Sequence, residues 1–168
     1  MTELAPAATR IGHVHLKVAD LERAIAFYRD VLGFEVTMRY GKQAAFLSAG
    51  GYHHHIGLNA WESAGATPPP PGHTGLYHTA FLYPDRASLA AVLRRVLTAG
   101  ITLDGAADHG ASEAIYLRDP DQNGVELYVD REEGDWPRDE GGNIALNNTP
   151  FDLQALLDTY PAQGVSQN

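Results

Sequence analysis

The sequence predicts an α+β fold built from two tandem modules, each running strand, helix, strand, strand, strand. Two observations predict it. Each half opens with a strand pattern and continues into an amphipathic helix pattern. A shift of 65 positions (78 − 13) lays His13 on His78 and Asp20 on Asp85, which marks an internal repeat. Because one helix covers only one face of a sheet, we expect the uncovered faces to form a cup-shaped curved sheet, with the helices outside.

The first module is predicted from residue 11 onward. Residues 11–18 alternate apolar and polar side chains, as a half-buried strand does, and residues 21–32 carry an apolar stripe at helical spacing. Asp20 can cap this helix and Gly33 can end it. Three strand candidates follow, at 34–40, 43–49 and 53–61.

The second module repeats this order after a proline-rich stretch. Residues 76–83 alternate as a strand does, Asp85 can cap the next helix, and Gly100 can stop it. Three strand candidates follow, at 101–105, 113–118 and 124–130. The expected organisation, all within one domain, is a first module over 1–65, a Pro-rich linker over 66–75, a second module over 76–131 and a C-terminal extension over 132–168.

The C-terminal extension is expected to contain a short amphipathic helix over residues 150–160. Thr149-Pro150 is typical of a helix start, and leucines recur at helical spacing after it. A helix this short is not stable alone, so its apolar stripe must dock on another element. We expect the preceding stretch, 134–148, to run across the surface towards the mouth of the cup. The tail should therefore cover part of the site or a subunit contact.

Composition excludes several classes of function. The chain has 168 residues with 12 Lys and Arg against 21 Asp and Glu, a formal net charge of −9. This balance argues against nucleic acid and anionic membrane as partners, since both need clustered cations. The absence of cysteine excludes disulfides, thiolate nucleophiles and iron–sulfur clusters. No apolar run is long enough for a bilayer and the first residues do not resemble a signal peptide, so we expect a cytoplasmic protein.

Three side chains of the repeat form a metal-ligand set. His13 and His78 lie at matching positions of the two opening strands, and Glu126 lies in the last strand of the second module. Two neutral imidazoles and one carboxylate, with other positions open, hold Fe(II) for oxygen chemistry. A lone strand histidine is more often structural, but the repeat relates these two, and an unpaired buried carboxylate is costly. His15 has no counterpart in the repeat, so we expect only a polar side chain that lines the cup.

The motifs around these residues resemble the vicinal oxygen chelate superfamily, which includes glyoxalases, bleomycin resistance proteins and extradiol dioxygenases. The likeness runs from about residue 11 to residue 160. Its opening motif contains Gly12-His13-Val14 and Leu32-Gly33-Phe34, and its closing motif is the segment 119–128. Within the superfamily the chain is most similar to short bacterial catechol 2,3-dioxygenases. The strings that carry this likeness are Gly51-Tyr52-His53-His54-His55, Gly75-Leu76-Tyr77-His78 and Asp108-His109-Gly110.

The resemblance implies a cofactor and a set of site residues. It implies Fe(II), with Mn(II) as the alternative, in the metal site of the cup. The implied metal ligands are His13, His78 and Glu126. The implied catalytic residues are His54, as acid/base group, and His109 and Tyr116, as hydrogen-bonding partners of the substrate.

Two points about the site residues and the closing turn stay undecided from the sequence. Strand alternation counted back from Gly57 favours His53 or His55 as the histidine that faces the cup, whereas the resemblance favours His54. Gln122 stands where the superfamily has a glycine in the closing turn, which bears on the turn geometry and not on the chemistry.

The function that the resemblance implies is extradiol cleavage of catechol or a substituted catechol with O₂, which yields a 2-hydroxymuconic semialdehyde. A small aromatic diol and O₂ are then the partners, and we expect a homo-oligomer. One alternative is a metal-dependent isomerase or epimerase of the glyoxalase type, which uses carboxylates from both modules. The predicted strand 53–61 contains no carboxylate, which counts against it. The other alternative is a non-catalytic binding module of the resistance type, which would not need the ligand set.

Overall fold

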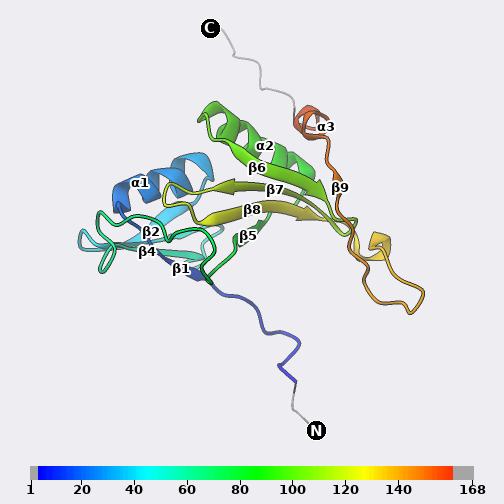
Figure 1. Ribbon diagram of the computed structural model, residues 1–168, viewed down its shortest axis with the longest axis horizontal. Helices are drawn as coiled ribbons and strands as arrows, with labels where there is room; N and C mark the ends of the chain where they lie inside the picture. The colour runs from blue at the N-terminus through cyan, green and yellow to red at the C-terminus, as the bar shows by residue number, and fades with distance from the viewer. Residues whose placement is uncertain (1–3, 161–168) are drawn as a thin grey trace, which may run out of the picture. The chain divides into compact units, whose positions relative to one another are not determined.

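A computed structural model describes residues 4–160 of the chain, which forms two compact units, Met1–Thr67 and Pro68–Asn168 (Figure 1). The first unit has one mixed sheet and one helical segment. Its elements are β1 (Val14–Lys17), α1 (Leu21–Ala26), a π-helical turn (Phe27–Val31), β2 (Glu35–Tyr40), β3 (Ala44–Ser48) and β4 (Ile56–Asn59). The strands lie in the order β1-β4-β3-β2, with β1 parallel to β4 and the other pairs antiparallel.

The core of the first unit lies between α1 and its sheet. Helix α1 packs against β3 and β4 and covers one face of the sheet (Figure 1). Ile25 of α1 is fully buried, as are Leu47, Ile56 and Leu58 of the strands. Burying a side chain of this size contributes about 1.5–3 kcal/mol. This layer therefore fixes which face of the sheet is left uncovered by the helix.

Local sequence sets the ends of the first helix as predicted. The Asp20 carboxylate accepts a hydrogen bond from the Arg23 N–H at 3.1 Å, which satisfies a free donor of the first turn. The segment 27–31 continues the helix with π-helical hydrogen bonding. Gly33 then takes a φ of 90°, which an L side chain rarely adopts. The predicted helix is thus confirmed in extent, with a second half wound more widely than an α-helix.

The second unit repeats the order and adds a C-terminal strand and helix. Its elements are β5 (Thr79–Leu82), α2 (Arg86–Thr98), β6 (Leu103–Asp108), β7 (Ser112–Arg118), β8 (Gly124–Asp130), a 3₁₀ turn (Glu133–Asp135), β9 (Thr149–Pro150) and α3 (Leu153–Asp158). The strands lie in the order β5-β8-β7-β6-β9, with β5 parallel to β8 and the other pairs antiparallel. The predicted α+β fold with two βαβββ modules is confirmed.

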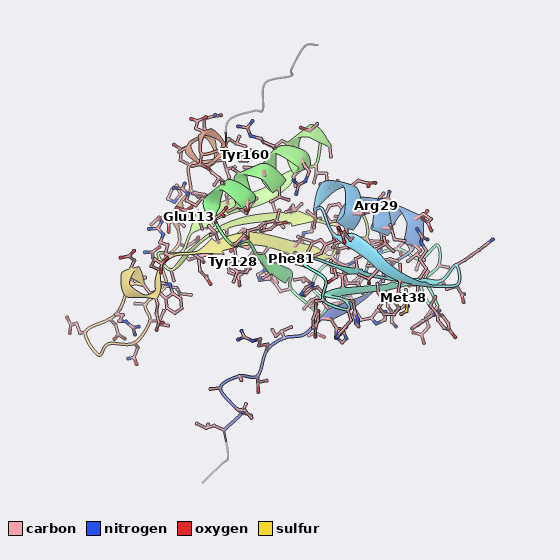
Figure 2. The ribbon with its side chains drawn as sticks, turned by 180° about the vertical axis from the view of Figure 1, so that it is seen from behind. Arg29, Met38, Phe81, Glu113, Tyr128 and Tyr160 are labelled. Carbon is pink, nitrogen blue, oxygen red and sulfur yellow. The ribbon has the colours of Figure 1, made fainter. Side chains whose placement is uncertain are left out.

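The two faces of the second sheet differ in character. Helix α2 covers one face, where Ile115 and Leu127 are fully buried (Figure 1). Glu113 points to this side and pairs with Arg86, the first residue of α2, at 2.9 Å. Tyr128 points to the opposite side, as Figure 2 shows. Glu126 precedes Tyr128 by two residues on the same strand, so it shares the face that α2 leaves uncovered.

The tail docks within the second unit, although its helix begins later than predicted. Thr149 and Pro150 form strand β9 and pair with β6, so the prediction of a helix start there is wrong. The helix begins after Asp152, whose carboxylate accepts the N–H groups of Gln154 and Ala155 at 3.0 Å. Leu156 of α3 is fully buried, and α3 packs against α2. No helix within residues 4–160 is both long and apolar enough to cross a membrane.

The turn before β8 accommodates the unusual glutamine. Gln122 has a φ of 65°, a left-handed conformation that costs a non-glycine residue about 1–2 kcal/mol. The buried carboxylate of Asp119 holds the turn, because it accepts hydrogen bonds from the backbone N–H of Asp121 at 2.9 Å and of Asn123 at 2.8 Å. The turn therefore forms without the glycine, and β8 starts in the register that carries Glu126.

Candidate active site

Four polar side chains form a hydrogen-bonded row on the uncovered face of the second sheet. Glu126 lies on β8, and Tyr116 lies directly opposite it on β7. His78 immediately precedes β5, the neighbour of β8 on the other side. His78 Nε2 lies 2.8 Å from Glu126 Oε2, Tyr116 Oη lies 3.2 Å from Glu126 Oε1, and His109 Nε2 lies 2.7 Å from Tyr116 Oη. The fold thus brings four of the predicted site residues together.

The close approach of His78 to β8 depends on a glycine. A Cβ on Gly124 would lie 2.1 Å from the Tyr77 carbonyl oxygen and 3.0 Å from His78 Cβ. A side chain at this position therefore cannot fit while the chain before β5 keeps its place. Gly124 sets the distance between His78 and Glu126.

The His78–Glu126 pair suits a divalent metal. Neighbouring ligands of an octahedral ion with bonds of about 2.1 Å are separated by about 3.0 Å. The 2.8 Å between His78 Nε2 and Glu126 Oε2 is close to that spacing. The buried Nδ1 of His78 has no hydrogen-bond partner within residues 4–160. In the same part of the chain no group of three or more His, Asp or Glu side chains is arranged to hold a metal ion.

Tyr116 is a hydrogen-bond donor at neutral pH. Burial raises the pKa of its phenol to about 12, and the negative charge of Glu126 acts in the same direction. The phenol therefore keeps its hydrogen. Its neighbour His109 lies in the turn between β6 and β7, and His109 Nδ1 lies 2.9 Å from the carbonyl oxygen of Asn147 in the tail. This contact was not predicted, because it uses the main chain and leaves no trace in the residue types.

A cavity of about 210 Å³ opens beside this row within the second unit. Its lining includes His78, Tyr116 and Tyr77, together with the ion pair of Arg118 and Asp104, whose Nε and Oδ2 atoms are 2.6 Å apart. The volume lies below the about 300–1,000 Å³ of drug-sized ligand pockets, so the cavity suits a small ligand. Its lining combines aromatic rings with charged side chains.

The first unit carries its own group of rings on the uncovered face. His13 directly precedes β1, and its ring centroid lies 4.5 Å from that of His54. The His54 ring also lies 5.0 Å from Phe46 of β3. Burial lowers the pKa of His54, and the neighbouring His13 adds to this, so the His54 imidazole is neutral at pH 7. A neutral imidazole of this kind can accept or deliver a proton.

The histidine triplet does not follow strand alternation. Strand β4 begins at Ile56, so the period of two does not extend back through the triplet. His55 Nδ1 lies 3.0 Å from Ser48 Oγ and accepts the Ala49 N–H at 3.3 Å. His53 Nδ1 lies 2.8 Å from His54 Nδ1. Within the triplet, it is the His54 ring that lies beside His13.

His15 lies on the same face, where a glycine makes room for it. A Cβ on Gly57 of β4 would lie 2.9–3.0 Å from three atoms of the His15 ring. The ring centroids of Phe46 and Trp61 lie 5.8 and 5.9 Å from the centroid of the His15 ring. No pattern of residue types singles out Phe46 or Trp61; the glycine inside the predicted strand 53–61 is the available signal of a close approach.

The order and pairing of the elements define a protein of two βαβββ modules. The chain matches the family described as "Glyoxalase/Bleomycin resistance protein/Dioxygenase superfamily" over residues 10–127. This match covers more than half of the chain, and the protein belongs to that family. The predicted membership is confirmed.

Among curated proteins, the chain is 42% identical over 150 residues to "Catechol-2,3-dioxygenase" of Bacillus subtilis (strain 168), covering 89% of this chain and 52% of that protein. The chain therefore spans about half the length of this relative. It is 30% identical over 158 residues to "Biphenyl-2,3-diol 1,2-dioxygenase 3" of Rhodococcus globerulus, covering 91% of this chain and 83% of that protein.

Solved structures show the same fold. A lactoylglutathione lyase from Agrobacterium tumefaciens is 29% identical with a TM-score of 0.56, over 74% of this chain and 94% of that one. A glyoxalase/dioxygenase from Nostoc punctiforme has a TM-score of 0.63 at 20% identity, over 79% of this chain and 99% of that one. The second likeness concerns the fold alone.

Proposed function

We propose that this protein is an Fe(II)-dependent extradiol dioxygenase that opens the ring of catechol or a substituted catechol with O₂. The observation that carries the proposal is the row of His78, Glu126, Tyr116 and His109 on one face of the second sheet. It combines two types of metal ligand with a phenol and an imidazole. Similarity to dioxygenases named for catechol and biphenyl-2,3-diol supports the choice of substrate class.

The proposed ligands of the metal are His13, His78 and Glu126, with Fe(II) or Mn(II) as the ion. The spacing of His78 and Glu126 fits such an ion. His13 belongs to the first unit, and His78 and Glu126 belong to the second. When bound, the metal supplies a two-point attachment for the vicinal oxygens of catechol, lowers the pKa of their hydroxyls and activates O₂.

The other residues of the site handle protons and orientation. Tyr116, which keeps its hydrogen, is a hydrogen-bonding partner of the substrate through its hydroxyl group. His109 contacts the Tyr116 hydroxyl at 2.7 Å and holds its position. His54 lies beside His13 and, as a neutral imidazole, accepts a proton from the diol and returns it.

The alternative function is that of a metal-dependent isomerase. It is favoured by one comparison, the likeness to the solved structure of a lactoylglutathione lyase. An isomerase of this type needs carboxylates from both modules. Strand β4, with the sequence Ile-Gly-Leu-Asn, has none. We therefore place ring cleavage first.

The test is anaerobic loading of the full chain with Fe(II), followed by catechol and then oxygen. We expect a yellow ring-cleavage product and one O₂ consumed for each catechol. A metal-loaded protein that takes up no oxygen with any catechol, and that isomerises a glutathione hemithioacetal, contradicts the proposal.

A matched pair of histidine variants links the activity to the site. His78→Ala should abolish both metal retention and ring cleavage. His73→Ala is the control, because His73 is exposed and its ring contacts only the Pro70 carbonyl oxygen, at 3.1 Å, among the described hydrogen bonds. Equal activity in the two variants would remove His78 from the metal site.

A further inference from the structure

The C-terminal extension runs alongside the loop that carries His109. Strand β9 pairs with the end of β6, with Asp108 opposite Thr149. Just before β9, the Asn147 N–H donates to the His109 carbonyl oxygen at 3.1 Å. The Asn147 carbonyl in turn lies 2.9 Å from His109 Nδ1. One residue of the tail thus contacts both the main chain and the ring of His109.

Gly110, beside His109, is the position against which Pro137 and Asn147 of the tail pack; we call this contact the seat of the tail. Gly110 has a φ of 80°, and a Cβ there would lie 2.7 Å from Pro137 Cγ and 2.9 Å from Asn147 Nδ2. Pro137 and Asn147 belong to the two limbs of a hairpin, which the Ala145 N–H closes by donating to the Pro137 carbonyl at 2.8 Å. Both sides of the hairpin therefore pack against Gly110, where the loop has no side chain.

The contact with Asn147 determines where His109 carries its hydrogen. A carbonyl oxygen only accepts, so His109 Nδ1 must be the donor. In the neutral ring Nε2 is then an acceptor, and its partner at 2.7 Å is the Tyr116 hydroxyl, which donates to it. The phenol has one hydrogen and two acceptors within reach, His109 Nε2 and Glu126 Oε1 at 3.2 Å. In the opposite tautomer, Nε2–H would donate to Tyr116 and free the phenol hydrogen for Glu126.

We propose that the C-terminal extension is a positioning element of the site, in which the main chain of Asn147 fixes the tautomer of His109 and thereby directs the Tyr116 hydroxyl. The tail acts at a distance from the reacting atoms, through His109. The effect on ring cleavage rests on the proposed function, whereas the tautomer is a property of the metal-free protein.

The tautomer can be read directly by NMR of the full chain labelled with ¹⁵N-histidine, at a pH where His109 is neutral. Spectra of a His109→Phe variant identify the His109 signals by their absence. We expect the wild-type ring to have a protonated Nδ1 and an unprotonated Nε2. A wild-type His109 with the hydrogen on Nε2 overturns the proposal.

Two glycine variants distinguish the loss of the Gly110 contacts from the strain that any side chain causes at a positive φ. Gly110→Ala should unseat Pro137 and Asn147 and move the hydrogen of His109 wholly or partly to Nε2. Gly142→Ala is the control, since Gly142 has a similar φ of 82° but nothing within 4 Å of its Cβ position. If Gly110→Ala fails to fold, Pro137→Ala loosens the same seat from the tail and should shift the equilibrium in the same direction. Variants at both positions that leave the tautomer unchanged contradict the proposal.

Kinetics of the Fe(II)-loaded protein then connect the tautomer to turnover. Loss of one oriented hydrogen bond should lower kcat of Gly110→Ala by about 10-fold relative to Gly142→Ala, with KM for catechol little changed. A fall in kcat with no change of tautomer contradicts the positioning role. A protein that never cleaves catechol but shows the expected tautomers refutes the proposed function and leaves the positioning of His109 intact.

Discussion

Replacing Gly124 by alanine tests how the second sheet holds His78 and Glu126, the proposed metal ligands. The new Cβ would lie 2.1 Å from the Tyr77 carbonyl oxygen, whereas ordinary contacts begin at 3.4 Å. The backbone of Tyr77 and His78 must therefore move away from β8 by 3.4 − 2.1 = 1.3 Å, or β8 must move by the same amount. Either movement changes the 2.8 Å separation of His78 Nε2 and Glu126 Oε2.

The energetic consequence follows from the size of this displacement. Forcing one extra methyl group into a packed site costs about 1–3 kcal/mol of the free energy of unfolding. For a protein of this length, each kcal/mol lowers Tm by about 2–4 °C. A shift of about 1 Å in a reacting group costs about 10²-fold in rate, so kcat/KM for catechol should fall by a similar factor.

The assay combines thermal unfolding of the metal-free protein with calorimetric Mn(II) binding, and Gly105→Ala serves as the control. Gly105 lies on β6 of the same sheet, and its Cβ position has nothing within 4 Å. We expect Gly124→Ala to lose stability and metal affinity together, while Gly105→Ala changes neither appreciably. Equal Tm and equal Mn(II) affinity in the two variants would refute the close approach as the cause of the ligand geometry.

Three further predictions concern single side chains. His54→Phe should leave metal and catechol binding intact and slow turnover by about 10²–10⁴-fold, as removal of an acid/base group does; single-turnover kinetics check this, and larger damage from His53→Phe or His55→Phe would move the role to that neighbour. Gln122→Gly should raise the unfolding free energy by up to about 1 kcal/mol, because it relieves a left-handed residue at φ 65°; a destabilised protein in urea unfolding would show that the glutamine side chain contributes more than the strain costs. Leu156→Ala should cost about 2–5 kcal/mol in the same assay, since the side chain is fully buried, and a cost below 1 kcal/mol would mean that α3 is not docked on α2.

The elements of the fold could be predicted because their signals are local. Asp20 and Asp85 precede apolar stripes, and both cap their helices in the structure. The end of the strand pattern around His53–His55 could not be predicted in this way. Side chains alternate through the triplet only if the strand itself extends that far, whereas the pairing with β3 that defines β4 begins at Ile56. The paired register of neighbouring strands, and not residue type, decides where such a strand starts.

The candidate site could be predicted only in part for a related reason. The repeat pointed to His78, and the register of β7 and β8 then set Tyr116 opposite Glu126. The link from His109 to Asn147 spans 38 residues and uses a main-chain carbonyl. Every residue has such a group, so no pattern of residue types predicts the contact. The later start of α3 has a similar cause, since pairing of Thr149 and Pro150 with β6 prevails over their local preference for a helix start.

The central claim is that one metal binds His13, His78 and Glu126 together. The most direct test is electron spin-echo spectroscopy of the Mn(II)-loaded full chain labelled with ¹⁵N-histidine, which counts the imidazole nitrogens bound to the metal. We predict two bound nitrogens in the wild-type protein and one in His13→Ala, with Glu126→Gln binding Mn(II) more weakly at an unchanged nitrogen count. A signal from two nitrogens that persists in His13→Ala, or from none in the wild-type protein, would contradict it.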